Sequence, residues 1–176
     1  MSCPPILRKA TCRDLPRLLL FFDRLDHDLS ARKFYRLHRC DGFNKLLCFL
    51  YLMYKLLLAQ LLKKETYIFV VALLSGSVVG VCHICVTRRD GVLIGDYGIV
   101  LDESVRGIGL GKRLSMKALS LAKRLGVGEV YLRVDVDNER AIKLYGSLGF
   151  KVCGHSYGFR YTSKEYIRQY VMRLRL

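Results

Sequence analysis

At 176 residues the chain is long enough for one domain with a sizeable buried core, and neither a Pro/Gly/Ser-rich linker nor an internal repeat divides it. We therefore expect a single domain over residues 1–176. The N-terminus lacks the pattern of a secretory signal peptide, which favours a cytoplasmic protein. The 7 cysteines, an odd number, are then expected to be reduced thiols, and a disulfide framework is excluded.

The formal net charge of +15 exceeds what one bound cofactor would need. Basic pairs recur along the chain, at Arg32-Lys33, Lys63-Lys64 and Arg88-Arg89, and more basic residues follow near the C-terminus. These residues could contact nucleic acid or another polyanion, or they could form a solvated basic surface. The sequence leaves both interpretations open.

The chain is expected to begin with a short strand followed by helices. The strand is predicted over Ile6–Ala10, and Thr11 or Asp14 could cap a helix that runs towards Leu25. Residues 30–63 are expected to be mostly helical.

One part of that helical region, Leu46–Leu62, is almost entirely apolar. A membrane span needs about 20 apolar residues and tolerates a central lysine such as Lys55 poorly, so we expect no span. A buried helix covered on more than one side is the prediction, and contact with a membrane surface is the alternative.

Strands and helices follow one another in the remaining two thirds of the chain. Ser75-Gly76-Ser77 and Arg88-Arg89-Asp90-Gly91 have the composition of turns between adjacent strands. The expected strands are Tyr67–Leu74, Val78–Thr87, Val92–Leu101, Glu129–Asp135, Lys151–Phe159 and Ile167–Leu174, and the expected helices are Leu114–Leu125 and one opened by Asn138.

Cys82 and Cys85 form a C-x-x-C pair, a spacing found in zinc sites. They lie within a predicted strand, where side chains alternate between the two faces, so these two should point apart. No second Cys/His pair with zinc-site spacing follows, and we expect no metal.

Residues 106–112 read Arg-Gly-Ile-Gly-Leu-Gly-Lys and join a predicted strand to a predicted helix. Glycines let the backbone turn tightly and approach a ligand, and the first N–H groups of a helix favour an anion. The spacing fits neither G-x-G-x-x-G nor a P-loop, because Lys112 is followed by Arg113 instead of Ser or Thr. We expect a bound pyrophosphate, and the alternative is a glycine-rich turn without a ligand.

Arg106, Gly109 and Gly111 resemble motif A of the GNAT superfamily of acyl-CoA N-acyltransferases, in which Gln or Arg precedes two spaced glycines. Residues 138–150, Asn-Glu-Arg-Ala-Ile-Lys-Leu-Tyr-Gly-Ser-Leu-Gly-Phe, resemble motif B of the same family. The resemblance covers residues 6–176. It implies an α/β fold with a mixed, mostly antiparallel central sheet of about seven strands and helices on both faces.

The resemblance also implies acetyl-CoA (coenzyme A) as the cofactor. Backbone N–H groups around Val100 would then bind the thioester carbonyl and stabilise the oxyanion of the tetrahedral intermediate. The implied cofactor-binding residues are Ile99, Val100, Leu101, Arg106, Gly107, Ile108, Gly109, Leu110, Gly111, Lys112, Asn138, Ala141 and Tyr145.

A general base is required because an acceptor ammonium with a pKa near 10.4 must lose its proton before it can attack. Asp96 is the first candidate, since it lies on the strand where related protein acetyltransferases carry a Glu. The alternative is a carboxylate paired with a surface arginine. Asp102 and Glu103 could serve as the base, or they could cap the turn that follows them.

Asn138, Ala141 and Tyr145 are spaced at i, i+3 and i+7 and so share one helix face. In the resemblance this face looks at the cofactor, and the Tyr145 hydroxyl is the general acid that protonates the leaving thiolate. The alternative is a core tyrosine with a satisfied hydroxyl.

These features predict an acetyl-CoA-dependent N-acetyltransferase in which a primary amine attacks the thioester directly, with a protein lysine or N-terminus as the expected acceptor. One alternative is a polyamine or other small-amine acetyltransferase, whose acceptor groove would need many of the 15 acidic residues. Another is a GNAT-like module that senses coenzyme A or binds nucleic acid without turnover. The resemblance further implies that Leu46–Leu62 packs near the acceptor groove or a partner subunit, which would make a homodimer.

Overall fold

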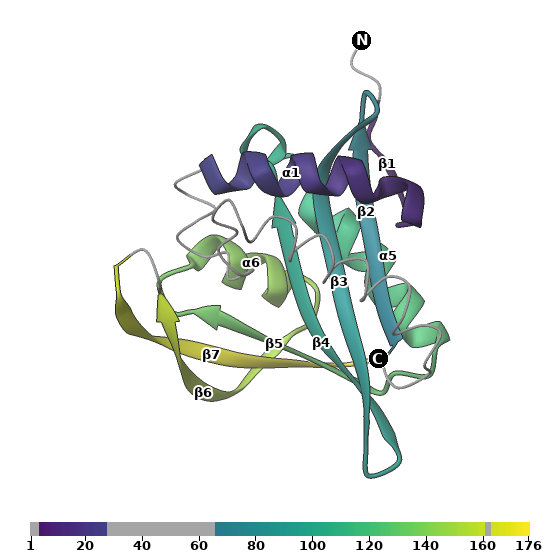
Figure 1. Ribbon diagram of the computed structural model, residues 1–176. Helices are drawn as coiled ribbons and strands as arrows, with labels where there is room; N and C mark the ends of the chain where they lie inside the picture. The colour runs from purple at the N-terminus through teal and green to yellow at the C-terminus, as the bar shows by residue number, and fades with distance from the viewer. Residues whose placement is uncertain (1–3, 28–65, 161–162) are drawn as a thin grey trace.

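A computed structural model describes residues 4–27, 66–160 and 163–176, and within them the core of the fold is a single β-sheet. Its strands are β1 (Ile6–Lys9), β2 (Thr66–Leu74), β3 (Ser77–Arg89), β4 (Val92–Leu101), β5 (Glu129–Asp135), β6 (Lys151–Arg160) and β7 (Glu165–Arg175). The 7-stranded sheet has the order β1-β2-β3-β4-β5-β7-β6 (Figure 1). Neighbouring strands are antiparallel except for β4 and β5, which are parallel. The mixed, mostly antiparallel sheet predicted from the sequence is confirmed.

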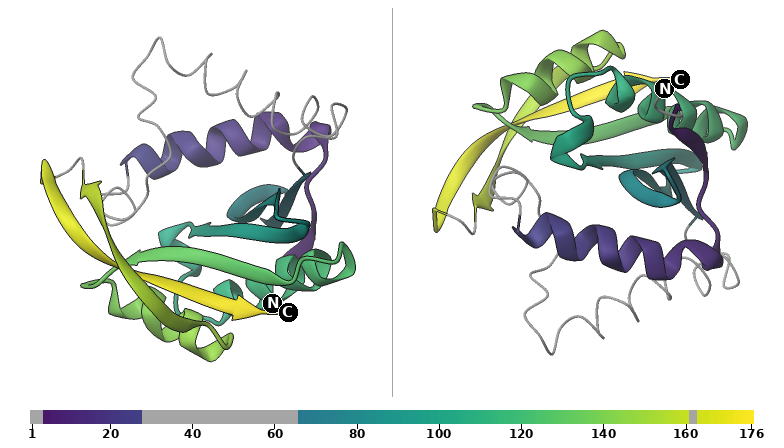
Figure 2. Two further views of the ribbon diagram at one scale, coloured as in Figure 1. Left: turned by 90° about the horizontal axis from the view of Figure 1, so that it is seen from below. Right: turned by 90° about the horizontal axis from the view of Figure 1, so that it is seen from above.

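Helices cover both faces of this sheet, as predicted (Figure 2). Helix α1 (Leu15–His27), which follows the short 3-10 helix η1 (Cys12–Asp14), lies on one face. Helices α5 (Leu110–Arg124) and α6 (Glu139–Ser147) lie on the other, after the 3-10 helix η3 (Glu103–Val105). The sheet therefore separates two apolar cores, which we call the α1-side core and the α5-side core.

Alternation along the strands divides their side chains between these two cores. On β3, Val81 packs in the α1-side core and the next residue, Cys82, packs in the α5-side core. Cys85 contacts the α1-side core. The two cysteines of the C-x-x-C pair thus face opposite ways, as their spacing predicted, and cannot bind one ion together.

Most predicted boundaries agree with the structure, but α5 begins at Leu110 instead of Leu114. Gly109 lies at the N-cap with φ +78, a left-handed conformation that a residue with a Cβ rarely adopts. The chain can therefore turn directly into the helix, and Leu110, Gly111 and Lys112 form its first turn.

The residues from 28 to 65, which include Leu46–Leu62, lie outside the described part of the chain. The predicted helices there, the homodimer contact and the membrane-surface alternative consequently stay predictions. In the segments that the structure does describe, no helix is long and apolar enough to span a membrane.

The sheet opens between its two parallel strands. β4 pairs with β5 over Ile94–Asp96 and Glu129–Tyr131, whereas β4 continues to Leu101 and β5 to Asp135. Figure 1 shows the two strands diverging beyond the paired stretch. We call the gap between residues 97–101 and residues 132–135 the β4–β5 opening.

Candidate active site

The glycine-rich loop of residues 106–109 and the first turn of α5 lie at one end of the β4–β5 opening, and we call them the cradle, after the anion that the sequence analysis predicts there. Gly107 and Gly109 both have positive φ, +84 and +78. The N-cap Gly109 offers no side chain, and Arg113 N–H is the group that bonds its carbonyl, at 3.2 Å. The N–H groups of residues 110–112 precede the first intrahelical bonds and point out of the helix end. A Cβ placed on Gly109 would meet nothing within 4 Å, so a ligand can approach this backbone.

Arg140, which the sequence analysis did not single out, brings a guanidinium to this loop. A Cβ placed on Gly107 would lie 3.6 Å from Arg140 Nη2. Arg140 is in the first turn of α6, so its proximity depends on how α6 packs beside α5. The sequence did not indicate this contact, because a chain of net charge +15 has many basic residues and nothing distinguishes Arg140 from the others.

The Arg106 side chain bonds to the end of β4, and its predicted contact with the cofactor stays a prediction. Its Nε and Nη2 donate to the carbonyl oxygen of Leu101 at 3.1 and 3.0 Å. The side chain thereby fastens the loop to the end of β4. The exposed Lys112 and Arg113 carry their charges on the first turn of α5.

The backbone of β4 presents alternate residues to the β4–β5 opening. Asp102 N–H donates to Val79 O at 2.9 Å, which puts Val100 in a hydrogen-bonded pair with Val81 on β3. The backbone groups of Ile99 and Leu101 therefore face the opening, and those of Val100 face β3.

Gly111 lies where β4, α5 and α6 meet. A Cβ on Gly111 would approach Leu101 Cδ1 to 3.3 Å and Leu144 Cδ2 to 3.4 Å. Such contacts are tighter than ordinary packing, so the glycine lets the first turn of α5 lie directly against the strand and the neighbouring helix. Ile108, in contrast, is 67% exposed.

The residues of motif B border the same region from α6. Asn138 is the N-cap of α6, and its side-chain oxygen accepts from Ala141 N–H at 3.2 Å. The predicted cap is confirmed. Ala141 is half-buried against the α5-side core.

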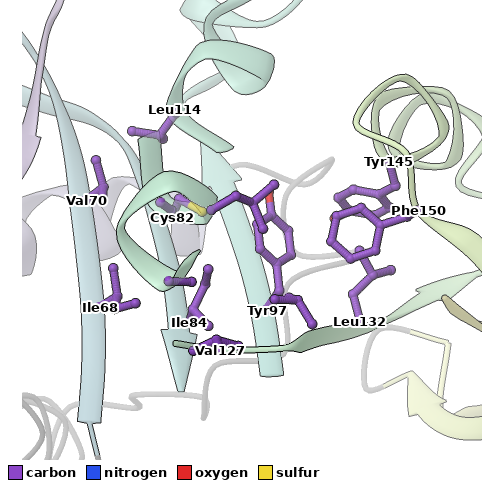
Figure 3. Packing of buried hydrophobic residues seen from close by; sticks show 14 of the residues in the cluster. Ile68, Val70, Cys82, Ile84, Tyr97, Leu114, Val127, Leu132, Tyr145 and Phe150 are labelled. Carbon is purple, nitrogen blue, oxygen red and sulfur yellow. The ribbon is translucent and has the colours of Figure 1, made fainter. Parts of the chain in front are cut away.

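Tyr145 is buried in the α5-side core, with 8% of its surface exposed. Its ring meets Tyr97 edge-on, with centroids 5.8 Å apart, and lies 6.0 Å from the ring of Phe150 (Figure 3). Burial raises the pKa of its hydroxyl well above the ordinary value of 10.0. Tyr145 therefore holds its proton at neutral pH, a requirement for a general acid.

Asp96 is the last residue of β4 that pairs with β5, so it marks the base of the opening. Its side chain is 65% exposed, and Oδ2 lies 4.0 Å from Arg133 Nη2. Alternation places it on the α1 side of the sheet, opposite Tyr97. The carboxylate is accessible from solvent, and the pairing with an arginine that the sequence analysis considered is also present.

Asp102 acts as a cap. Its Oδ1 accepts from Ser104 N–H at 3.1 Å and from Ser104 Oγ at 2.6 Å, and Arg24 Nε lies 3.5 Å from Oδ2. The hydrogen bonds from Ser104, aided by Arg24, lower the pKa of this carboxyl group. Glu103 is exposed on η3. Of the three acidic candidates, Asp96 lies at the base of the opening.

A sheet that opens between two parallel strands beside a glycine-capped helix places the chain among the α/β proteins. The sequence matches the acetyltransferase (GNAT) family over residues 32–150, and the chain belongs to this family.

Two curated relatives match parts of the chain. Mycothiol acetyltransferase of Nocardiopsis dassonvillei is 42% identical over 62 residues, which is 35% of this chain and 19% of that protein. L-amino acid N-acetyltransferase AaaT of Escherichia coli is 32% identical over 104 residues, 58% of this chain and 64% of that protein. The chain thus spans about a fifth of the first relative and less than two thirds of the second.

Solved structures share the whole fold. A GNAT-family acetyltransferase from Streptococcus pneumoniae superimposes with a TM-score of 0.78 at 23% identity, covering 98% of this chain and 99% of that one. YncA of Salmonella typhimurium, solved with its cofactor acetyl-CoA, gives 0.74 at 20% identity and covers 99% and 95%. The ribosomal-protein-S5-alanine acetyltransferase of Vibrio fischeri gives a TM-score of 0.80 at 16% identity, covering 99% of this chain and 94% of that one.

Proposed function

We propose that the protein is an acetyl-CoA-dependent N-acetyltransferase that transfers an acetyl group to a primary amine. The observation that carries the proposal is the N-terminal cradle of α5 at the mouth of the β4–β5 opening. Its outward N–H groups at residues 110–112 and the guanidinium of Arg140 suit a pyrophosphate. The backbone groups of Ile99 and the N–H of Leu101, whose carbonyl already accepts from Arg106, suit the amides of a pantetheine arm. Membership of the GNAT family supports the same assignment.

Acetyl-CoA would supply an acetyl thioester to the site. Tyr145, buried and protonated, would donate its hydroxyl proton to the sulfur that leaves. Asp96, on the opposite face at the base of the opening, would accept the proton of the acceptor ammonium. Because its carboxylate is exposed, a water molecule can relay that proton.

We keep a protein lysine or N-terminus as the acceptor, in line with the Vibrio fischeri structural neighbour, which is named as an alanine acetyltransferase of a ribosomal protein. A polyamine is less favoured, because the guanidinium of Arg133 lies beside Asp96 and would repel a second ammonium. The same arginine favours one small acceptor, a free amino acid, whose amine would approach Asp96 while its carboxylate pairs with Arg133. The name of the Escherichia coli relative supports that second candidate.

Calorimetric titration with acetyl-CoA tests the cofactor site. Gly109 and Gly126 flank α5, have φ of +78 and +82, and have nothing within 4 Å of an added Cβ. Gly109→Glu and Gly126→Glu therefore introduce the same backbone strain and the same charge, but Gly109→Glu alone places the charge in the cradle. We expect Gly109→Glu to lose affinity about tenfold or more and Gly126→Glu to keep it. Equal losses in both variants, or no binding by the folded wild type, would refute the proposal.

The acceptor is tested by acetylation of a panel that contains an N-terminal peptide, a lysine peptide, spermidine and free amino acids. Faster turnover of peptides would support the first candidate. If free amino acids are preferred and Arg133→Gln raises their KM selectively, the second candidate replaces it.

A further inference from the structure

Three polar side chains lie together in the α5-side core, directly beneath the first turn of α5. Tyr97 on β4 is 6% exposed, Ser115 on α5 and Cys82 on β3 are 0% exposed. Figure 3 shows the hydroxyl end of Tyr97 beside the sulfur of Cys82, with Tyr145 and Phe150 on the other side of the ring. Buried hydroxyl groups destabilise a core unless they are hydrogen-bonded, so their partners show what they hold together.

The direction of each hydrogen bond follows from counting protons. Ser115 Oγ donates its single proton to the carbonyl of Gly111 at 2.7 Å. Tyr97 OH lies 2.6 Å from Ser115 Oγ. Because the Ser115 proton is already directed at Gly111, Tyr97 is the donor of this second bond. The result is a directed chain of hydrogen bonds from Tyr97 on β4 through Ser115 to Gly111 in the first turn of α5.

Cys82 lies beside these hydrogen bonds. Its thiol interacts with the Tyr97 hydroxyl, and burial raises the pKa of the thiol to about 12, so it stays protonated. It thus completes the polar surroundings of Tyr97 and has no nucleophilic role.

The series of hydrogen bonds reaches a part of the proposed active site at each end, Gly111 and Tyr97. Gly111 is one of the residues whose N–H faces the anion cradle, and its carbonyl is the group that Ser115 holds. Tyr97 is the first residue of β4 beyond the stretch paired with β5, and its ring contacts Tyr145 edge-on at 5.8 Å. A phenylalanine would make the same ring contacts, so packing alone does not account for the hydroxyl.

We propose that Tyr97 and Ser115 are positioning residues that tie the anion cradle of α5 to β4 and, through the ring of Tyr97, to Tyr145. The pair keeps the cradle and the proposed general acid in fixed register across the β4–β5 opening. The inference rests on the proposed function for its binding and kinetic consequences, but the mechanical link can be measured in the ligand-free protein.

Amide hydrogen exchange of the ligand-free protein tests the link itself. Tyr97→Phe and Ser115→Ala should each speed exchange of the amides of residues 113–115, which donate to the carbonyls of residues 109–111, about fivefold, the factor that one net hydrogen bond gives, while the C-terminal half of the helix is unchanged. Ser147→Ala is the matched control, because Ser147 Oγ also donates to a carbonyl of its own helix, Leu144 O at 2.8 Å, but accepts no bond from a tyrosine among the described residues. Unchanged exchange in both folded variants would overturn the proposal.

Calorimetry with coenzyme A and steady-state kinetics then test the functional consequence. Tyr97→Phe and Ser115→Ala should each weaken coenzyme A binding about fivefold, and the double variant should lose no more than either single one, because both break the same link. Since Tyr97→Phe keeps the ring beside Tyr145, KM for acetyl-CoA should rise while kcat stays within about twofold.

The control for a purely structural effect is Tyr131→Phe, which removes a hydroxyl bond to Glu129 of 2.6 Å on the other face of the sheet. Its coenzyme A affinity should match that of the wild type. Losses that simply follow the drop in Tm, in control and test variants alike, would overturn the positioning role. If the folded wild type binds no coenzyme A, the proposed function fails, and the exchange experiment alone decides the link.

Discussion

Tyr145 has the core position that the sequence analysis gave as one alternative, and its role as general acid is a proposal compatible with that position. Its ring is part of the α5-side core, and burial keeps the proton on its hydroxyl. Burial keeps the hydroxyl protonated but also makes it a weaker acid, because desolvation disfavours the phenolate, so proton transfer to the leaving thiolate would have to work against this shift. The same packing against Tyr97 and Phe150 fixes the direction of the hydroxyl.

The pH dependence of catalysis follows from this raised pKa. The acceptor amine loses its proton as pH rises, whereas Tyr145 keeps its proton to values above its ordinary pKa of 10.0. We expect kcat/KM to increase from pH 6 to about 9.5 without a descending limb, as measured by initial rates over that range. A descending limb below pH 9 that disappears in Tyr145→Phe would contradict the raised pKa of Tyr145, although it would support its role as the acid.

Tyr145→Phe itself should lower kcat about a hundredfold and leave acetyl-CoA affinity within about twofold. Tyr170→Phe is a suitable control, because Tyr170 borders the same core from β7. It should retain nearly full activity.

At the scale of the elements, the attachment of α1 depends on one buried carboxylate. Asp14, 0% exposed, accepts from Arg8 Nη1 and Nη2 at 2.7 and 2.6 Å and from Thr11 N–H at 2.8 Å. These bonds join β1 to η1 and so set the start of α1. The Arg8 guanidinium, helped by Thr11, lowers the pKa of Asp14 to about 2.

Asp14→Asn should therefore destabilise the protein by about 2 kcal/mol at pH 7, from the shift of the Asp14 pKa below its ordinary value. Because the folded-state pKa is the lower one, this contribution is complete above about pH 4 and is lost as pH falls towards 2. Urea unfolding at pH 7 and pH 3 measures the difference. Asp90→Asn, in the exposed turn after β3 with φ +47, is the control and should change stability little at either pH.

The sequence was sufficient to predict elements whose signal is local. The apolar run Val92–Leu101 and the cap Asn138 were found because strand composition and N-cap chemistry depend on neighbouring residues. The predicted start of α5 was four residues too late. Three glycines precede Lys112 and Arg113 and weaken the helix signal there, and the sequence does not show that Gly109 adopts a left-handed φ that starts the helix.

Contacts between elements could not be predicted in the same way. Arg140 reaches Gly107 only because α6 packs beside the loop, and Tyr97 meets Ser115 across a gap of 18 residues in the chain. The direction of the Arg106 side chain, onto Leu101, also depends on how the loop folds back. Hydrophobic spacing fixes which face of an element is buried but not which polar atoms then meet.

At the scale of the whole molecule, the charge of +15 is concentrated in part along α5. Its 15 residues include no acid, and five are basic: Lys112, Arg113, Lys117, Lys123 and Arg124. The cradle therefore lies at one end of a positive helix surface, while the turn after β3, with Arg88 and Arg89, lies at the opposite end of the strands (Figure 1). A field of this kind attracts a polyanionic ligand before any specific contact forms.

Acetyl-CoA binding should consequently weaken severalfold when KCl is raised from about 50 to about 500 mM, because the Debye length falls from over 10 Å to below 5 Å. Binding of uncharged pantetheine should not change. Lys117→Glu, about 10 Å along α5 from its start, should weaken acetyl-CoA binding at low salt and remove part of the salt dependence. Arg89→Glu changes the net charge equally, yet lies far from the cradle and should have a smaller effect. Equal effects of the two substitutions would mean that total charge, and not the α5 surface, draws the cofactor to its site.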